Sequence, residues 1–139
     1  MKYGDIKDLI PQRSPILMVD ELLEVNGEEA HTSFTIRSDN FFLDEEGQFE
    51  ASGLIEHIAQ SASAFAGYLA ILAGAEKPPI GYIGEVKNFK CHHYPRVGEE
   101  LYTIIRQGPE VEGVMLLSGK TYIEEKIVAE TEMKIYIQR

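Results

Sequence analysis

The sequence has few cysteines, few basic residues and no long apolar run. Cys91 is the single cysteine among 139 residues, so no internal disulfide can form and we expect a reducing compartment. The 13 Lys and Arg residues are outnumbered by 23 Asp and Glu residues, which gives a formal charge of −10. Nucleic acids and anionic membrane surfaces require a basic footprint, so the charge argues against either as the main partner.

No segment is typical of a membrane span or a signal peptide. The longest weakly polar run, residues 61–75, consists mostly of Ala, Ser and Gly. It is shorter than the roughly 20 apolar residues that a spanning helix needs, and a buried helix is the better interpretation. The first ten residues contain no uninterrupted apolar core and no small-residue cleavage site. We therefore expect a cytoplasmic protein with no membrane partner.

The length and composition predict one domain over residues 1–139. A hydrophobic content of 44% and a charged content of 26% are ordinary for a globular domain, and 139 residues suit a single hydrophobic core. The pattern predicts a short helix at 5–10, an extended apolar segment at 15–25 and a strand at 28–37. A long helix at roughly 52–72 is followed by breakers and then by four strands, at 80–91, 99–107, 111–123 and 127–138.

One long helix followed by a meander of long strands predicts an α+β fold, with the helix on a curved antiparallel sheet. Small residues recur along the helix and would let strands wrap closely around it: Ala59, Ala62, Ala66, Gly67 and Ala70. Its larger apolar residues spread over a wide arc, which indicates a helix that is buried on most sides.

Three separated motifs carry a resemblance to a known family. The first is an IPQRSPILMVD segment with Pro11, Arg13, Pro15, Leu17, Val19 and Asp20. The second joins Phe41-Phe42 to a helical Glu56-His57-Ile58-Ala59-Gln60 sequence. The third is Phe89-Lys90 followed by a turn and Gly98. In this order they resemble the hot-dog-fold dehydratases that act on β-hydroxyacyl chains carried by acyl carrier protein.

This resemblance implies a hot-dog fold, a long helix wrapped by a curved antiparallel sheet, and at least a dimer with the site at its interface. The family uses a histidine base and a helix carboxylate acid from different subunits, and Glu56 matches the acid. The backbone of residues 51–53 (Ala51, Ser52 and Gly53) would hold the thioester carbonyl, because free N–H groups at a helix start stabilise an enolate oxygen. Gln60 lies one turn after Glu56 and could orient it, and Phe42 belongs to the substrate-binding set.

The sequence also departs from the family. The family's Gly-His-Phe-Pro-Gly stretch, which carries the histidine, is replaced here by LDEEGQFEAS, and the histidine of its Pro-His-Arg entry is Gln12. His57 follows Glu56 but lies about 100° around the helix, so it should not face the same pocket. His92, His93 or the loop carboxylates Asp44, Glu45 and Glu50 could supply a base, although solvent-exposed roles are the more ordinary interpretation.

The chain therefore resembles a divergent dehydratase-like branch of the kind found beside aryl-polyene-type lipid clusters, whose members can pair with a conventional dehydratase subunit. We expect no metal and no bound cofactor, because no residue cluster has metal-ligand spacing and no phosphate-binding loop is present. The substrate would be carried on the phosphopantetheine of a carrier protein or of coenzyme A. Lys87, Lys90 and Arg96 form a basic segment that could dock an acidic carrier protein.

Three functions compete at this point. The leading one is a β-hydroxyacyl-thioester dehydratase, or dehydratase-like protein, of fatty-acid or aryl-polyene-type lipid synthesis. The second is a hot-dog acyl thioesterase, a relative that also uses a helix carboxylate and needs no histidine base. The third is a non-catalytic subunit that completes a dehydratase heterodimer. For the assembly we expect either a homodimer or a heterodimer with a related hot-dog subunit, or a higher oligomer.

Overall fold

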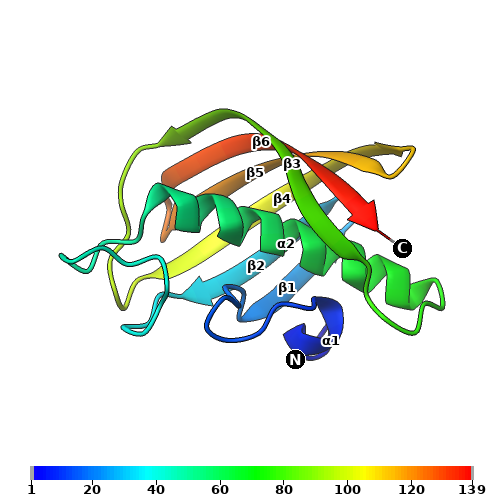
Figure 1. Cartoon of the computed structure of the whole chain (residues 1–139), viewed down its shortest axis with the longest axis horizontal. Helices are drawn as coiled ribbons and strands as arrows, with labels where there is room; N and C mark the ends of the chain where they lie inside the picture. The colour runs from blue at the N-terminus through cyan, green and yellow to red at the C-terminus, as the bar shows by residue number, and fades with distance from the viewer. Residues whose placement is uncertain (1, 139) are drawn as a thin grey trace.

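A long helix lies across the concave face of a six-stranded sheet in the computed structural model of the chain, which describes residues 2–138 (Figure 1). The elements in chain order are α1 (Ile6–Leu9), β1 (Glu21–Asn26), β2 (Glu29–Thr35), α2 (Ala51–Leu72), β3 (Ile80–Cys91), β4 (Glu100–Val111), β5 (Val114–Ile123) and β6 (Lys126–Gln138). The strands are paired antiparallel in the order β1-β2-β4-β5-β6-β3. The predicted α+β fold, with one helix on a curved antiparallel sheet, is confirmed.

The alternation of β6 shows how the sequence sets the two faces of the sheet. Ala129, Thr131, Met133 and Ile135 are buried toward the helix, as a strand with a period of two requires. Alternating with them, Glu132 and Tyr136 are exposed on the outer face. The strand has β5 on one side and β3 on the other, so its backbone is paired along both edges.

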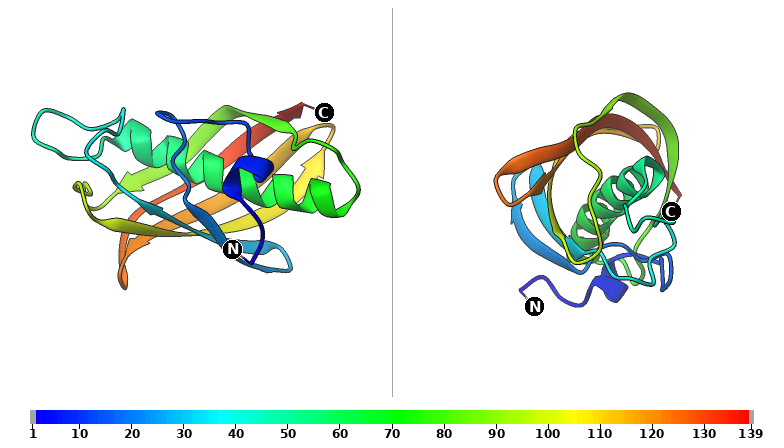
Figure 2. Two further views of the ribbon diagram at one scale, coloured as in Figure 1. Left: turned by 90° about the horizontal axis from the view of Figure 1, so that it is seen from below. Right: turned by 90° about the vertical axis from the view of Figure 1, so that its left-hand side faces the viewer.

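The sheet curls around α2, and the end view in Figure 2 shows the strands enclosing the helix on most of its circumference. Close packing depends on small residues. A Cβ added at Gly119 of β5 would lie 2.5 Å from Ile58 of the helix, and one at Gly67 would lie 1.9 Å from the carbonyl oxygen of Leu9. Gly67 therefore admits α1 against the long helix, whereas the sequence suggested that the small residues mainly admit strands.

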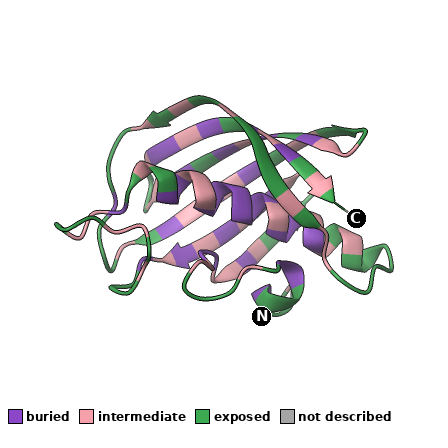
Figure 3. Ribbon diagram, in the orientation of Figure 1, coloured by how far each residue is buried: buried purple, intermediate pink, exposed green. Residues whose placement is uncertain are grey.

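The two edges of the sheet differ sharply. β1 is short and carries Glu21 and Glu24, which are features that discourage pairing with another chain, whereas both edge strands have irregular registers. β3 is twice as long, and Figure 3 shows it mostly as exposed. Along it Ile80, Tyr82 and Ile83 are 41%, 54% and 39% exposed. Within residues 2–138 no strand covers its outer edge. β3 is thus the edge that is available to a partner.

The predicted element boundaries need two corrections. α2 begins at Ala51, with Glu50 at its N-cap, rather than near residue 52. β4 continues to Val111 instead of stopping near residue 107, because a bulge between Gln107 and Glu110 accommodates Pro109 within the strand. Over residues 2–138, no helix has both the length and the apolar character that crossing a bilayer requires.

Candidate functional site

The site is a cavity of about 390 Å³ between α2, the edge strand β3 and the loop that follows α1. Glu56 is half-buried in its wall. The lining is largely apolar on the strand side, and the complete set is Gln12, Glu56, Ala59, Gln60, Ser63, Ile80, Gly81, Tyr82, Ile83 and Ile135. Because four of these residues belong to β3, the cavity lies beside the exposed sheet edge.

Gln60 holds the carboxylate of Glu56 in place. Its Nε2 donates to Glu56 Oε2 at 2.9 Å and to the Ile16 carbonyl at 2.8 Å, and its Oε1 accepts from the Met18 N–H at 2.6 Å. The buried amide thus joins the helix to the segment before β1. Among residues 2–138, the second oxygen of Glu56 has no hydrogen-bond partner. One carboxylate oxygen is fixed by the protein, and the other is free to meet a ligand.

Glu56 lies in the second turn of α2, since the helix starts at Ala51 and its first turn contains no acidic residue. An acidic residue that served only to complement the helix dipole would be expected in the first turn, where the dipole effect is concentrated. Glu56 also makes no capping contact, because its recorded hydrogen-bond partner is Gln60. The position of Glu56 is therefore better explained by the cavity that it faces.

The start of the helix is separate from this cavity. The Gly53 N–H already donates to the Glu50 carbonyl at 2.9 Å, which leaves the N–H groups of Ala51 and Ser52 as the ones without acceptors among the described residues. Phe42 packs directly on Gly53, where an added Cβ would lie 2.7 Å from the Phe42 Cβ. None of these four residues lines the Glu56 cavity. Their predicted roles in substrate binding stay predictions.

His57 faces the sheet, as its position on the helix indicated. The ring is fully buried and stacks on Phe34, with ring centroids 5.7 Å apart. Its Nδ1 lies 2.7 Å from the Met18 carbonyl and its Nε2 lies 2.7 Å from Thr103 Oγ1, which is 2.8 Å from Thr121 Oγ1. A carbonyl can only accept, so Nδ1 donates, Nε2 accepts from Thr103, and Thr103 accepts from Thr121.

Burial lowers the pKa of His57 to about 4, although the Met18 carbonyl and the Asp20 carboxylate act in the opposite direction. The imidazole is therefore neutral at neutral pH, and both of its nitrogens are used within the core. Such a ring has no free nitrogen to offer a substrate.

The other candidates for a base lie away from the cavity. His92 and His93 are exposed beside Glu130 and Glu99, at 3.1 and 3.8 Å. His31 contacts Tyr102 and Glu29 on β4 and β2. None of the histidines lines the Glu56 cavity.

The acidic loop is also outside it. Asp44 Oδ1 accepts from the N–H groups of Glu46 and Gln48 at 2.8 and 2.9 Å, which makes it a turn-forming side chain. Glu45 and Glu50 are exposed.

The basic segment, which contains Lys87, Lys90 and Arg96, has acidic residues close to it in the structure. Lys87 forms an ion pair with Glu85 at 3.2 Å, and Lys90 lies opposite Glu130 in the β3–β6 register. The backbone N–H of Arg96 donates to the Glu99 carboxylate at 2.7 Å. Carboxylates from β3 itself, from β6 and from the following turn therefore accompany the three cations. Their role in carrier docking stays a prediction.

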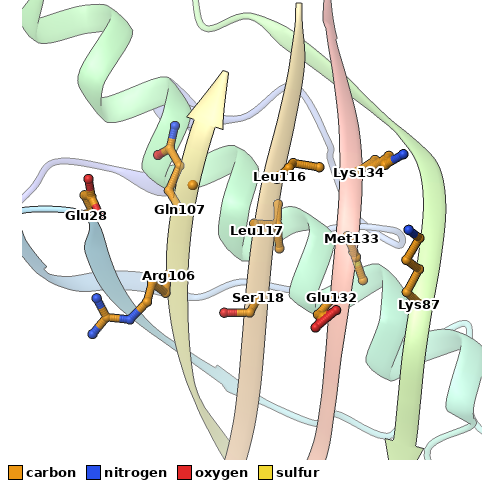
Figure 4. Close-up of a pocket in the computed structure, with 11 residues that line it drawn as sticks. Glu28, Lys87, Arg106, Gln107, Leu116, Leu117, Ser118, Glu132, Met133 and Lys134 are labelled. Carbon is orange, nitrogen blue, oxygen red and sulfur yellow. The ribbon is translucent and has the colours of Figure 1, made fainter. Parts of the chain in front are cut away.

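A larger hollow of about 650 Å³ lies on the outer face of the sheet, with the helix behind it (Figure 4). Its cations have acidic partners, since Arg106 pairs with Glu29 at 2.8 Å and Lys134 lies 3.8 Å from Glu85. Glu28 and Glu132 also line the hollow, and no residue of α2 does. Volume alone does not make it the functional site. The smaller cavity is the better candidate because it contains the Glu56 carboxylate held by Gln60. Throughout residues 2–138, no group of His, Cys, Asp and Glu side chains is arranged to hold a metal ion.

A long helix wrapped by an antiparallel sheet, with a helix carboxylate in a cavity beside the sheet edge, defines a hot-dog-fold protein of the dehydratase type. A family model described as ApeP dehydratase, of the ApeP-like group, matches residues 4–139. The chain belongs to this ApeP-like dehydratase family, and it is a dehydratase or a dehydratase-like protein. The resemblance inferred from the three sequence motifs is confirmed.

Relatives of known name agree with this assignment. The chain is 26% identical over 143 residues to the 3-hydroxyacyl-[acyl-carrier-protein] dehydratase FabZ of Wolinella succinogenes, covering 95% of this chain and 92% of that protein. The FabZ of Campylobacter fetus is also 26% identical, over 149 residues, with 96% and 95% covered.

Solved structures share the fold. The dehydratase heterocomplex ApeI:P from Xenorhabdus doucetiae contains a chain with a TM-score of 0.91 and 16% identity, covering 99% of this chain and 93% of that one. A hypothetical thioesterase with coenzyme A from Streptococcus pneumoniae has a TM-score of 0.66 and 10% identity, with 86% and 90% covered.

The sequence did not identify every residue of the cavity. Ile80, Tyr82 and Ile83 were predicted only as part of a strand, and their place in the wall depends on β3 being the sheet edge. Gln12 was noted only as a departure from the family pattern, whereas the structure places it in the wall with Glu56.

Proposed function

We propose that the chain takes part in the dehydration of a β-hydroxyacyl thioester, with Glu56 as the acid that protonates the departing hydroxyl group. The observation that carries this proposal is the half-buried Glu56 carboxylate in the wall of the cavity, which Gln60 holds at one oxygen while the other has no hydrogen-bond partner among residues 2–138. A positioned acid of this kind typically contributes about 10²- to 10⁴-fold to a rate. The FabZ relatives, which are named as 3-hydroxyacyl-[acyl-carrier-protein] dehydratases, support the choice of substrate.

The reaction also needs a base to take the α-proton, and we propose that a partner subunit supplies it. No histidine lines the cavity, and His57 uses both of its nitrogens in the core. The cavity borders the exposed edge of β3, so a second hot-dog subunit pairing there would bring its own residues close to Glu56. The related heterocomplex ApeI:P supports a heterodimer with a second dehydratase subunit.

We propose that the acyl chain arrives as a thioester on the phosphopantetheine of a carrier protein or of coenzyme A, and that the protein needs no cofactor of its own. The reaction would then take place in the cytoplasm, where such thioesters are made. Lys87, Lys90 and Arg96 are the proposed contacts for an acidic carrier. Reversal of Lys87 and Lys90 to Glu should slow turnover of carrier-bound substrate while leaving a carrier-free pantetheine thioester unaffected. An equal effect on both substrates would contradict docking at this segment.

Activity assays separate the dehydratase from its competitors. The purified chain, alone and mixed with a conventional dehydratase subunit, is given β-hydroxyacyl and acyl thioesters. We expect an enoyl product from the mixture, and Glu56→Gln should abolish it while the matched control Glu76→Gln, on an exposed residue after α2, should not. Release of free thiol without enoyl product would indicate a thioesterase. Full activity of the Glu56→Gln mixture would leave the chain as a structural subunit and refute the acid role.

A further inference from the structure

Gln12 differs from the other amide in the cavity wall because its side-chain oxygen is uncommitted. Gln60 uses both its oxygen and its nitrogen in hydrogen bonds to the protein. The Oε1 of Gln12 is buried and has no hydrogen-bond partner among the residues that the structure describes. A buried polar atom without a partner costs free energy, so such an atom calls for an explanation. One explanation is that a ligand supplies the missing hydrogen-bond donor.

The backbone beneath Gln12 is firmly held, so the position of the side chain is not accidental. Arg13 donates from Nη1 to the carbonyls of Ile10 and Gln12, both at 2.8 Å, and from Nη2 to the carbonyl of Lys7 at 2.9 Å. These bonds join the loop to α1, and Leu9 of α1 packs against Gly67 of α2. Gln12 therefore lines the cavity from a fixed loop. Its terminal torsion is soft, and its oxygen has no hydrogen bond to lose on turning toward a donor.

We propose that Gln12 is a specificity-determining residue that accepts a hydrogen bond from the β-hydroxyl group of the acyl thioester. This inference rests on the proposed function. A hydroxyl group has one hydrogen to donate and lone pairs that accept. When its hydrogen is directed to Gln12 Oε1, a lone pair is left for the proton of Glu56, and both residues line the same cavity.

The assignment agrees with the balance of the reaction. The base removes the α-proton, the electron pair of that C–H bond forms the C=C bond, and the C–O bond breaks with its electrons on oxygen. Glu56 supplies the proton that turns the departing hydroxyl into water. The enoyl product has no hydroxyl hydrogen in this position, so the Gln12 contact is made by the substrate and not by the product. Gln12 thereby favours β-hydroxyacyl chains over saturated or unsaturated ones.

The test measures equilibrium binding in a Glu56→Gln background, which prevents turnover during the titration. The probes are β-hydroxyoctanoyl-pantetheine and β-fluorooctanoyl-pantetheine, because fluorine is close to hydroxyl in size but has no hydrogen to donate. The parent protein here is Glu56→Gln with Gln12 intact. We expect it to bind the hydroxyl probe about tenfold more tightly than the fluoro probe, equivalent to about 1.4 kcal/mol. Gln12→Met should remove this preference by weakening only the hydroxyl probe. Gln107→Met is the matched control, since its Oε1 is also buried without a partner but lies outside this cavity.

Several results would overturn the inference. A preference that survives Gln12→Met, or is absent in the parent, excludes the hydrogen bond. A lower melting temperature of Gln12→Met, or a weaker subunit association measured by sedimentation, would mean that the amide serves the fold or meets a partner's donor. These failures leave the proposed function intact. If the parent with its partner subunit binds neither thioester, the proposed function itself is contradicted.

Discussion

Two neighbouring rows of residues on α2 have opposite hydrogen-bonding states. In the row that faces the sheet, His57 and Ser61 are fully bonded, to Met18, Thr103 and Thr32. In the row that faces the cavity, Gln60 is fully bonded, but Glu56 has only one of its two oxygens bonded. The rows differ by a rotation of about 100° around one helix. Saturated polar groups fix the helix on the sheet, and the unsaturated one is left for a ligand, so stability and function should respond separately to mutation.

Glu56→Gln is the strongest test of whether the two rows affect function and stability separately. We expect turnover in the presence of the partner subunit to fall by about 10²- to 10⁴-fold, or about 3 to 5 kcal/mol of transition-state stabilisation, because the acid is lost. The free energy of unfolding should change by less than about 0.5 kcal/mol, since the amide keeps the shape and can still meet Gln60. Enoyl formation and urea denaturation give the two values. A large loss of stability would show that Glu56 belongs to the structural row.

The reverse pattern is expected for His57→Ala. This change removes a buried ring and leaves the Met18 carbonyl and the Thr103 hydroxyl without their partner, so the free energy of unfolding should fall by about 3 to 4 kcal/mol. Urea denaturation checks this, with His92→Ala as the control because His92 is exposed. Equal effects of the two substitutions would remove the distinction between buried and exposed histidines.

Lowering the pH should reduce the contribution of His57, in the row that faces the sheet, to the free energy of unfolding. The folded-state pKa of His57, about 4, lies below the usual value of 6.5, so between these values the unfolded chain binds more protons. The contribution of the neutral ring is complete above pH 6.5, declines as the pH falls, and is lost as the pH passes about 4. The total is about 3 kcal/mol. Comparing denaturation of wild type and His57→Leu across this range isolates the effect from that of the carboxylates. Parallel profiles would contradict it.

A smaller effect sharpens the comparison at the end of the hydrogen-bond chain. Thr121→Val removes the hydroxyl that donates to Thr103 and should cost about 1 kcal/mol of unfolding free energy, with activity unchanged. Thr121→Ser retains the hydroxyl and should preserve more of the stability. If the valine variant lost activity at unchanged stability, the network would belong to the site rather than to the core.

The fold was largely predictable because its signals are local. The period-two pattern of residues 127–138 and the small residues of the long helix identify a strand and a buried helix without any tertiary information. The position of Glu56 and its contact with Gln60 also follow from helical spacing, since residues four apart share a face.

The composition of the site was less predictable because it depends on contacts between distant segments. Ile83 enters the cavity wall only because β3 pairs with β6 at the end of the sheet, and Gln12 enters it through the packing of the N-terminal loop. The irregular end of β4 was missed for a related reason. Pro109 in the local sequence predicts the end of a strand, whereas the bulge allows pairing of β4 with β5 to continue past it.

The close approach of Leu9 to Gly67 has a consequence for the dimensions of the site. Gly67 is eleven residues from Glu56, or about 16 Å along the helix axis at 1.5 Å per residue. Any side chain at position 67 would push the Leu9 backbone outward, and Arg13 would carry that displacement into the loop that bears Gln12. We therefore expect a side chain at position 67 to change the width of the cavity opening beside Glu56, three helical turns away. Substitution of that glycine would then change the space available to the acyl chain, although residue 67 lies outside the cavity.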